Sequence, residues 1–204
     1  MYIKINIDGN DYEGNLSPVL HSKACEASVK ESIPPYVDKR DGQSYRCVKI
    51  GSQIWMAQNL NYEIGDSYCY NNNPDHGELY GRLYTWAAAI GVCPMGWHLP
   101  SKAEWIKLAS FVGIQCAATH LKSINGWIGE SIGTNEYGFA ALPAGYRSES
   151  DRDFHYLGKL AGWWTSSEVS TDKACATRFN SNAAQIQTEE YGKLSAFSVR
   201  CVKD

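Results

Sequence analysis

The stretch WHLPSKAEWIKLASFVG, residues 97 to 113, carries the clearest helix signal in the chain and decides its fold class. Ser101 and Glu104 have the spacing of a capping box, in which each side chain binds the backbone N–H of the other residue. Gly113 is a natural stop, because glycine readily adopts the left-handed conformation that ends many helices. Between these signals, apolar side chains recur at helical spacing, at Trp105, Leu108, Ala109 and Val112. We therefore expect a helix from about Ser101 to Gly113 with one buried face.

The segments just before this helix alternate between strand and turn signals. Residues 41 to 60 predict paired strands around a turn at Gly51-Ser52, because their side chains alternate along each side of that turn. Residues 65 to 81 are dense in Asn, Asp, Gly and Pro, which predicts a loop. Residues 83 to 90, LYTWAAAI, predict a short second helix.

The two ends of the chain differ from this middle part. The first fifteen residues predict a β-hairpin with a tight turn at Asp8-Gly9. Residues 16 to 38 show no period, and Pro34-Pro35 requires an extended backbone, so we expect a linker there. Beyond about residue 125 short aromatic runs alternate with Gly, Ser and Asn, which predicts strands and long loops. Two helices followed by loop-rich β structure predict an α+β fold class.

Composition excludes several classes of function. The 204 residues suit one domain with a small appendage, and the 44% hydrophobic and 20% charged residues are typical of globular proteins. The net charge of -3 and the scattered basic residues argue against nucleic acid as a partner. No run of about 18 apolar residues predicts a membrane span. Residues 1 to 20 lack the basic head and apolar run of a signal peptide, so the localisation stays open.

Cysteine and histidine patterns do not predict a metal site. The histidines lack ligand spacing and there is no CxxC, so we expect neither a structural zinc nor any other cofactor. An odd number of cysteines leaves at least one unpaired within the chain, and their pairing depends on a compartment that the sequence does not declare. The seven are at positions 25, 47, 69, 93, 116, 175 and 201.

Six blocks of sequence together carry a resemblance to a known family. They read DGQSYRCVKIGSQIWMAQNLNY, YGRLYTWAAA, CPMGWHLPSKAEW, YGFAALPAGYR, WWTSSE and FSVRCVKD. In this order they resemble the Fibrobacter succinogenes major paralogous domain over about residues 39 to 204. The resemblance implies a C-type-lectin-like fold, with two helices flanking a small antiparallel sheet and long irregular loops. It also implies a cell-surface or virion protein, with residues 1 to 38 as a separate N-terminal hairpin and linker segment.

A second resemblance concerns the C-terminal part. GYR at 145 to 147, GWWTSSE at 162 to 168 and FSVRCV at 197 to 202 are similar to the variable region of target proteins of diversity-generating retroelements. It implies a ligand-binding module with a hypervariable surface within about residues 147 to 191, for a protein or glycan partner. Of the adjacent tryptophans on the expected strand, one should be buried and Trp163 could face ligand. The expected ligand-binding residues are Ser148, Glu149, Ser150, Asp151, Asp153, His155, Tyr156, Lys159, Trp163, Arg178, Asn180, Gln185, Gln187, Glu189 and Glu190.

Three alternatives remain open beside the binding module. A structural tip or assembly protein of a virion or surface fibre would also suit the chain, and a homo-oligomer would add avidity. Cys175 and Cys201 invite comparison with formylglycine-generating enzymes, but Cys201 lies in a closing strand block and reads as packed, so we expect no enzyme. The carboxylates of Glu149, Asp151 and Asp153 could bind calcium, although solvated loop residues are the simpler interpretation.

Overall fold

In the computed structural model of the protein, the helix expected from the capping box, α3, spans Lys102–Val112. The Ser101 hydroxyl accepts a hydrogen bond from the backbone N–H of Glu104, and the Glu104 carboxylate accepts one from the backbone N–H of Ser101 at 2.7 Å. The helix ends at Gly113 and buries the expected four side chains, which confirms the prediction.

The structure describes residues 2–7, 10–15, 33–129 and 133–204, in two compact units, Met1–Ser32 and Ile33–Asp204. In the first unit β1 (Tyr2–Ile7) pairs antiparallel with β2 (Asn10–Asn15), which confirms the N-terminal hairpin. Its expected Asp8-Gly9 turn and most of the expected linker lie outside the described residues.

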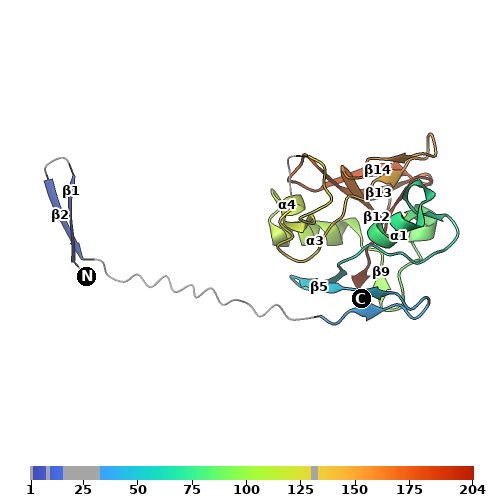
Figure 1. The fold of residues 1–204 in the computed structure, drawn as a ribbon, viewed down its shortest axis with the longest axis horizontal. Coiled ribbons are helices and arrows are strands. Elements are labelled where there is room, and N and C mark those ends of the chain that lie inside the picture. Colours follow the sequence, from blue (N-terminus) through green and yellow to red (C-terminus); the bar gives the residue numbers. More distant parts are fainter. Residues whose placement is uncertain (1, 8–9, 16–32, 130–132) are drawn as a thin grey trace. The chain divides into compact units, whose positions relative to one another are not determined.

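The second unit contains a large sheet and two smaller ones. The large sheet has the strand order β11-β10-β15-β12-β13-β14, with β8 paired to β15 and β7 paired to β8. Its strands are β7 (Ser67–Tyr68), β8 (Leu83–Thr85), β10 (Tyr146–Arg147), β11 (Phe154–His155), β12 (Leu160–Glu168), β13 (Lys173–Asn180), β14 (Gln187–Gly192) and β15 (Ala196–Ser198). Helix α3 packs against β12 and β13 of the large sheet and against β5, which lies on the other side of the helix in the view of Figure 1.

The second sheet joins both ends of the unit. It has the order β5-β6-β16-β9, formed by β5 (Cys47–Ile50), β6 (Gln53–Met56), β16 (Val202–Lys203) and β9 (Trp97–His98). The antiparallel β5–β6 pair confirms the strands expected around Gly51-Ser52. A two-stranded sheet is formed by β3 (Tyr36–Val37) and β4 (Ser44–Tyr45). The mixture of sheets and helices is an α+β fold, as the sequence predicts.

The core lies on both faces of β12. Trp163 packs with α3 residues and Phe179 on one face, and Trp164 packs with Tyr84 and Phe197 on the other. Both tryptophans are 0% exposed, so the expectation that only one of them is buried is wrong. The reason is that β12 is an inner strand covered on both faces, and alternating side chains then enter two cores instead of one core and solvent.

The helices near the expected loop also differ from the sequence reading. The loop expected at residues 65 to 81 contains a 3-10 turn (Tyr70–Asn72) and α1 (Pro74–Tyr80), because Asn73 caps that helix and Pro74 suits its first position. In the second expected helix only Trp86–Ala89 is helical, as α2, since the residues before it pair as β8. A further short helix, α4 (Ala117–Leu121), was not expected. The described residues therefore hold four α-helices and not two.

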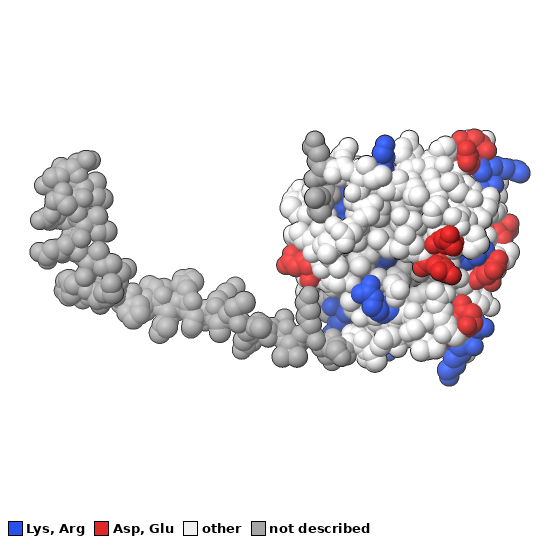
Figure 2. Space-filling model, viewed as in Figure 1, with Lys and Arg blue, Asp and Glu red and all other residues white. Residues whose placement is uncertain are grey.

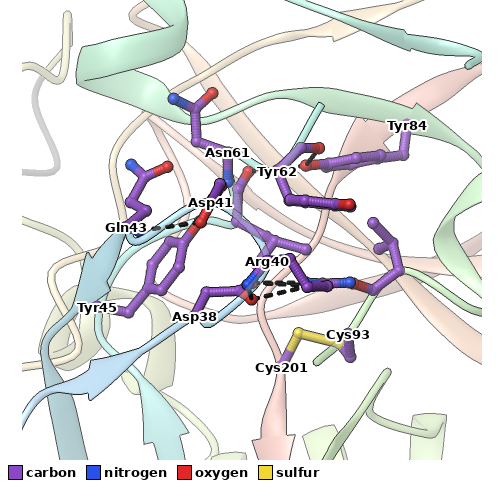
Figure 3. Close-up of polar contacts among 12 residues, drawn as sticks. Asp38, Arg40, Asp41, Gln43, Tyr45, Asn61, Tyr62, Tyr84, Cys93 and Cys201 are labelled. Atoms are coloured by element: carbon purple, nitrogen blue, oxygen red, sulfur yellow. Dashed lines mark hydrogen bonds and ion pairs between the residues drawn. A yellow bond between two sulfur atoms is a disulfide. The ribbon is translucent and has the colours of Figure 1, made fainter. Parts of the chain in front are cut away.

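An ion pair with a buried carboxylate holds the start of the second unit, next to a disulfide. Cys93 and Cys201 form a disulfide, and beside it Asp38, which is fully buried, accepts hydrogen bonds from Arg40 at 2.9 and 2.6 Å (Figure 3). Arg40 also donates to the carbonyl of Val92 at 2.8 Å and lies 3.9 Å from the ring of Tyr62. The folded unit thus includes residues on both sides of the domain boundary expected at residue 39. Of the helices described, none has the length and apolarity that crossing a membrane requires.

Candidate ligand-binding surface

An aromatic cluster forms the base of the candidate site. The Tyr146 ring on β10 stacks on Phe197 of β15, with ring centres 5.1 Å apart and planes 12° apart. Tyr191 of β14 meets the same Phe197 ring at 4.8 Å and Tyr146 at 6.3 Å. Tyr156 stacks on Tyr146 at 6.0 Å and stays exposed. The cluster therefore brings together the end of the β10–β11 hairpin and the β13–β14 pair.

A glycine makes this cluster possible. Gly162 on β12 lies beneath the Phe197 ring, and a Cβ atom added there would lie 2.5 Å from a ring carbon. Gly162 pairs with Arg178 on β13, so the aromatic cluster lies next to the polar residues of the neighbouring strand.

Polar side chains of β13 and β14 extend from this base. Arg178 donates a hydrogen bond to the Tyr191 hydroxyl at 2.9 Å and forms an ion pair with Glu189. Gln187 stands opposite Arg178 in the register and accepts a hydrogen bond from the Asn180 amide at 2.7 Å. Alternation along the strands places these side chains on the face that carries Trp164 farther along.

The loop between β10 and β11 supplies the other half of the surface. Asp151 binds His155 at 2.9 Å and accepts a hydrogen bond from the backbone N–H of Asp153, which, with the contact to His155, holds the pKa of the Asp151 carboxyl below its usual range. Ser148 and Ser150 bind each other through their hydroxyls at 2.8 Å. The polar groups of this loop form most of their hydrogen bonds with one another. Most of its exposed side chains therefore do not hold the scaffold together.

Glu149 joins the β10–β11 loop to β14. A Cβ atom added to Gly192 would lie 1.9 Å from a carboxylate oxygen of Glu149, so that carboxylate rests on the glycine backbone. Burial raises the pKa of Tyr146, and it raises the pKa of Tyr191 to about 12, which keeps both hydroxyls protonated at neutral pH. The base of the surface is therefore neutral, and its charges lie at the edges.

Most of the residues expected from the sequence are exposed or half-buried, and they lie on the segment from β10 to the end of the β10–β11 hairpin or on the β13–β14 pair. We call this set the display surface; it comprises Ser148, Glu149, Ser150, Asp151, Asp153, His155, Tyr156, Arg178, Asn180, Gln187 and Glu189. Lys159 is exposed in the turn before β12, where its carbonyl accepts a hydrogen bond from the backbone N–H of Ser181. On the face shown in Figure 2, basic and acidic side chains are interspersed and large areas carry no charge.

Besides Lys159, three expected residues do not belong to the display surface. Trp163 is wrong as a ligand contact, because it is fully buried and its indole N–H donates to the Asn59 side chain at 2.8 Å. Glu190 pairs with Cys175 in the register and points to the opposite face of β14. Gln185 is exposed but binds Gln115, near the start of α4.

The sequence analysis did not identify some residues that build the display surface. Tyr146, Tyr191 and Phe197 form its base, but an isolated aromatic residue in a strand gives no signal of its partners. Lys122 is also essential to the turn before β14: it is buried and donates to the carbonyls of Asn180 and Ala183 at 2.6 and 2.9 Å. Burial lowers its pKa to about 8.

The cysteines of the described residues comprise one disulfide and four free thiols. Cys201 is bonded to Cys93, so it does not pair with Cys175, and Cys47, Cys69, Cys116 and Cys175 are free thiols. Within residues 33–129 and 133–204, no group of three or more His, Cys, Asp or Glu residues could hold a metal ion.

The fold and this surface define an α+β domain whose polar loops meet on one face of a sheet. Residues 48–203 match the family model described as the Fibrobacter succinogenes major domain. The match covers more than half of the chain, and the chain belongs to this family. Neither a curated protein nor a solved structure matches the chain.

Proposed function

We propose that the chain is a ligand-binding module with a C-type-lectin-like scaffold, and that the display surface recognises a protein or glycan partner. The observation that carries the proposal is the meeting of two polar segments, residues 148–156 and 178–189, around the Tyr146–Tyr191 pair. Aromatic anchors among adaptable polar side chains are typical of recognition surfaces.

The energetic separation between scaffold and surface supports this proposal. The tryptophans of β12 and the residues of α3 are buried, so their substitution would cost several kcal/mol, about 3–5 for a Trp to Ala change. Exposed residues such as Ser150, Asp151 and Gln187 contribute little to folding, and their replacement typically changes stability by less than about 0.5 kcal/mol. The surface could then diversify without loss of the fold, as in a variable protein of a diversity-generating retroelement.

A four-site variant tests the tolerance. Asp151→Ser, Asp153→Ser, Gln187→Ser and Glu189→Ser together remove charged and amide groups from both halves of the display surface. The melting temperature should fall by no more than about 4 °C, because these side chains are exposed. Cooperative loss of structure in this variant would contradict the proposal.

A binding screen tests the function itself. The wild-type domain is applied to arrays of glycans and of folded proteins, and each ligand found is measured again with the four-site variant. Its binding should be lost in that variant and kept in a control with Lys102→Ser and Lys107→Ser, which are exposed on α3. Equal binding by the wild type and the four-site variant would show that recognition takes place elsewhere.

A further inference from the structure

A cleft in the second unit shares no residue with the display surface. This cleft has a volume of about 440 Å³, within the range of small-molecule sites. Its walls come from residues 43–61, 77–81, 123–125 and 135–142, and Arg200 lies against it. We call it the Arg200 cleft.

Arg200 is a buried cation without an anionic partner among the described residues. Its guanidinium donates to the side-chain oxygen of Asn59 at 3.1 and 2.7 Å and to the carbonyl of Phe139. The ring of Phe139 lies 4.3 Å from it. Burial lowers the pKa of Arg200 to about 9, with repulsion from Arg46 as a smaller cause, so the group is still charged at neutral pH.

A charge in this environment favours an incoming anion. Buried charges in proteins are normally paired, because an isolated ion loses its hydration without compensation. A guanidinium carries five N–H donors, and the three bonds to Asn59 and Phe139 use only some of them. Arg46, exposed at the edge of the cleft, adds a second positive charge.

The rest of the cleft is rich in side-chain amides. Gln43, Asn61 and Tyr45 lie near one another on one side, where the Tyr45 hydroxyl accepts a hydrogen bond from the backbone N–H of Asn61 (Figure 3). The side-chain oxygen of Asn61 is buried and has no hydrogen-bond partner. Further amides come from Gln58, Asn125 and Asn135. Amides both donate and accept, which matches the hydroxyl groups of a ligand.

Arg200 also has a structural role that the test must separate from binding. The Asn59 oxygen that it contacts accepts a hydrogen bond from Trp163 at 2.8 Å, so removal of Arg200 would disturb the core. Arg46 has no such role, since its side chain is exposed. Variants of Arg46 and Asn61 therefore report on the cleft with less risk to the fold.

We propose that the Arg200 cleft binds a small hydroxylated carboxylate, with its carboxylate toward Arg200 and Arg46 and its hydroxyls toward the amides of Gln43 and Asn61. The carboxylate would pair the buried cation, and a hydroxyl would supply the donor that the Asn61 oxygen lacks. A cyclic sugar acid such as glucuronate carries both features and serves as the probe.

Titration of the full chain with D-glucuronate, D-glucose and acetate tests the proposal. Calorimetry gives the affinity, and ¹H–¹⁵N spectra report the backbone amides of Gln43 and Asn61 against that of Thr188 on β14. Glucuronate should bind with one site per chain, at least about tenfold more tightly than glucose or acetate, and shift the two cleft amides alone. Arg46→Gln should weaken binding about threefold, and Asn61→Leu should weaken it about tenfold, because a hydroxyl of the ligand loses its hydrogen-bonding partner.

Lys107→Gln is the matched control, because it removes one exposed positive charge on α3, away from the cleft, and should leave the affinity unchanged. The proposal fails if glucuronate does not bind, if glucose binds equally well, or if Arg46→Gln and Lys107→Gln have the same effect. A shift of Thr188 in place of the cleft amides would also overturn it. Since the display surface is not involved, none of these results decides the proposed function.

Discussion

The ring of Phe197 packs directly on the backbone of Gly162, so that a single methyl group on this glycine would lie 2.5 Å from the ring. Gly162 is not in the left-handed region, so the constraint is one of space and not of backbone conformation. Phe197 in turn supports Tyr146 and Tyr191. The position of the aromatic base therefore depends on a residue with no side chain.

Gly162→Ala should destabilise the protein by about 1–3 kcal/mol, because the added methyl group overpacks the core and displaces Phe197. The free energy of unfolding in urea measures the effect. Gly65→Ala is the control, since an added Cβ atom there meets nothing within 4 Å. Equal stability of the two variants would contradict the packing.

Cys93→Ser should cost about 3–5 kcal/mol, because the disulfide to Cys201 closes a loop with a sequence separation of 108 and limits the unfolded chain. Thermal unfolding with and without a reducing agent measures the loss. Cys116→Ser, at an exposed free thiol, should leave the melting temperature unchanged. If reduction lowers the stability of Cys93→Ser as much as that of the wild type, the bond does not act as described.

Asp38→Asn should destabilise the protein by about 1.5–3 kcal/mol at pH 7, because it weakens the charge-assisted hydrogen bonds that the buried carboxylate accepts from Arg40, whose side chain is 30% exposed. The hydrogen bond from Arg40 lowers the pKa of Asp38, so the carboxylate adds stability above about pH 4, and that stability is lost as the pH falls through the lowered pKa. Wild type and variant should therefore converge in acid when unfolding is followed from pH 7 to pH 2. Asp66→Asn, at an exposed residue, should run parallel to the wild type throughout.

His98→Gln should lose a small pH-dependent part of the stability. Burial alone would lower the pKa of His98, but hydrogen bonds to Asp204 at 2.6 Å and Glu104 at 2.8 Å raise it on balance. The stabilisation is therefore complete below about pH 6.5 and is lost as the pH rises through the raised pKa. The side chain is 41% exposed, so we expect about 0.5 kcal/mol at pH 5.5 and none at pH 9. High salt should reduce the difference, and a difference that grows toward pH 9 would refute the assignment.

Elements that are specified by neighbouring residues, such as capped helices and tight turns, could be predicted from the sequence. The capping box of α3 and the turn at Gly51-Ser52 specify their own segments, and both were predicted correctly. The cap of α1 was present as well, in Asn73 and Pro74, but the surrounding Asn and Gly residues concealed it. The short helix expected at residues 83 to 90 was found in part, as the four residues of α2, whereas the five-residue helix α4 is too short for a periodic signal.

Features that depend on distant segments could not be read in this way. The burial of both Trp163 and Trp164 requires that β12 be an inner strand, which depends on how residues 196 to 198 pair with it. The partner of Cys201 could not be derived for the same reason. The display surface was located through its polar loops, whereas Tyr146 and Tyr191, which join those loops, are 45 residues apart in sequence and meet only in the fold.

The bond between Cys93 and Cys201 has a consequence for what happens when a protease cuts an exposed loop. The backbone between Ser148 and Asp153 lies inside the covalent ring that this bond closes. A protease that cut this loop would leave one nicked molecule, with both pieces still tethered and still paired through the sheet. Such a molecule would run as an intact chain on a denaturing gel until a thiol was added.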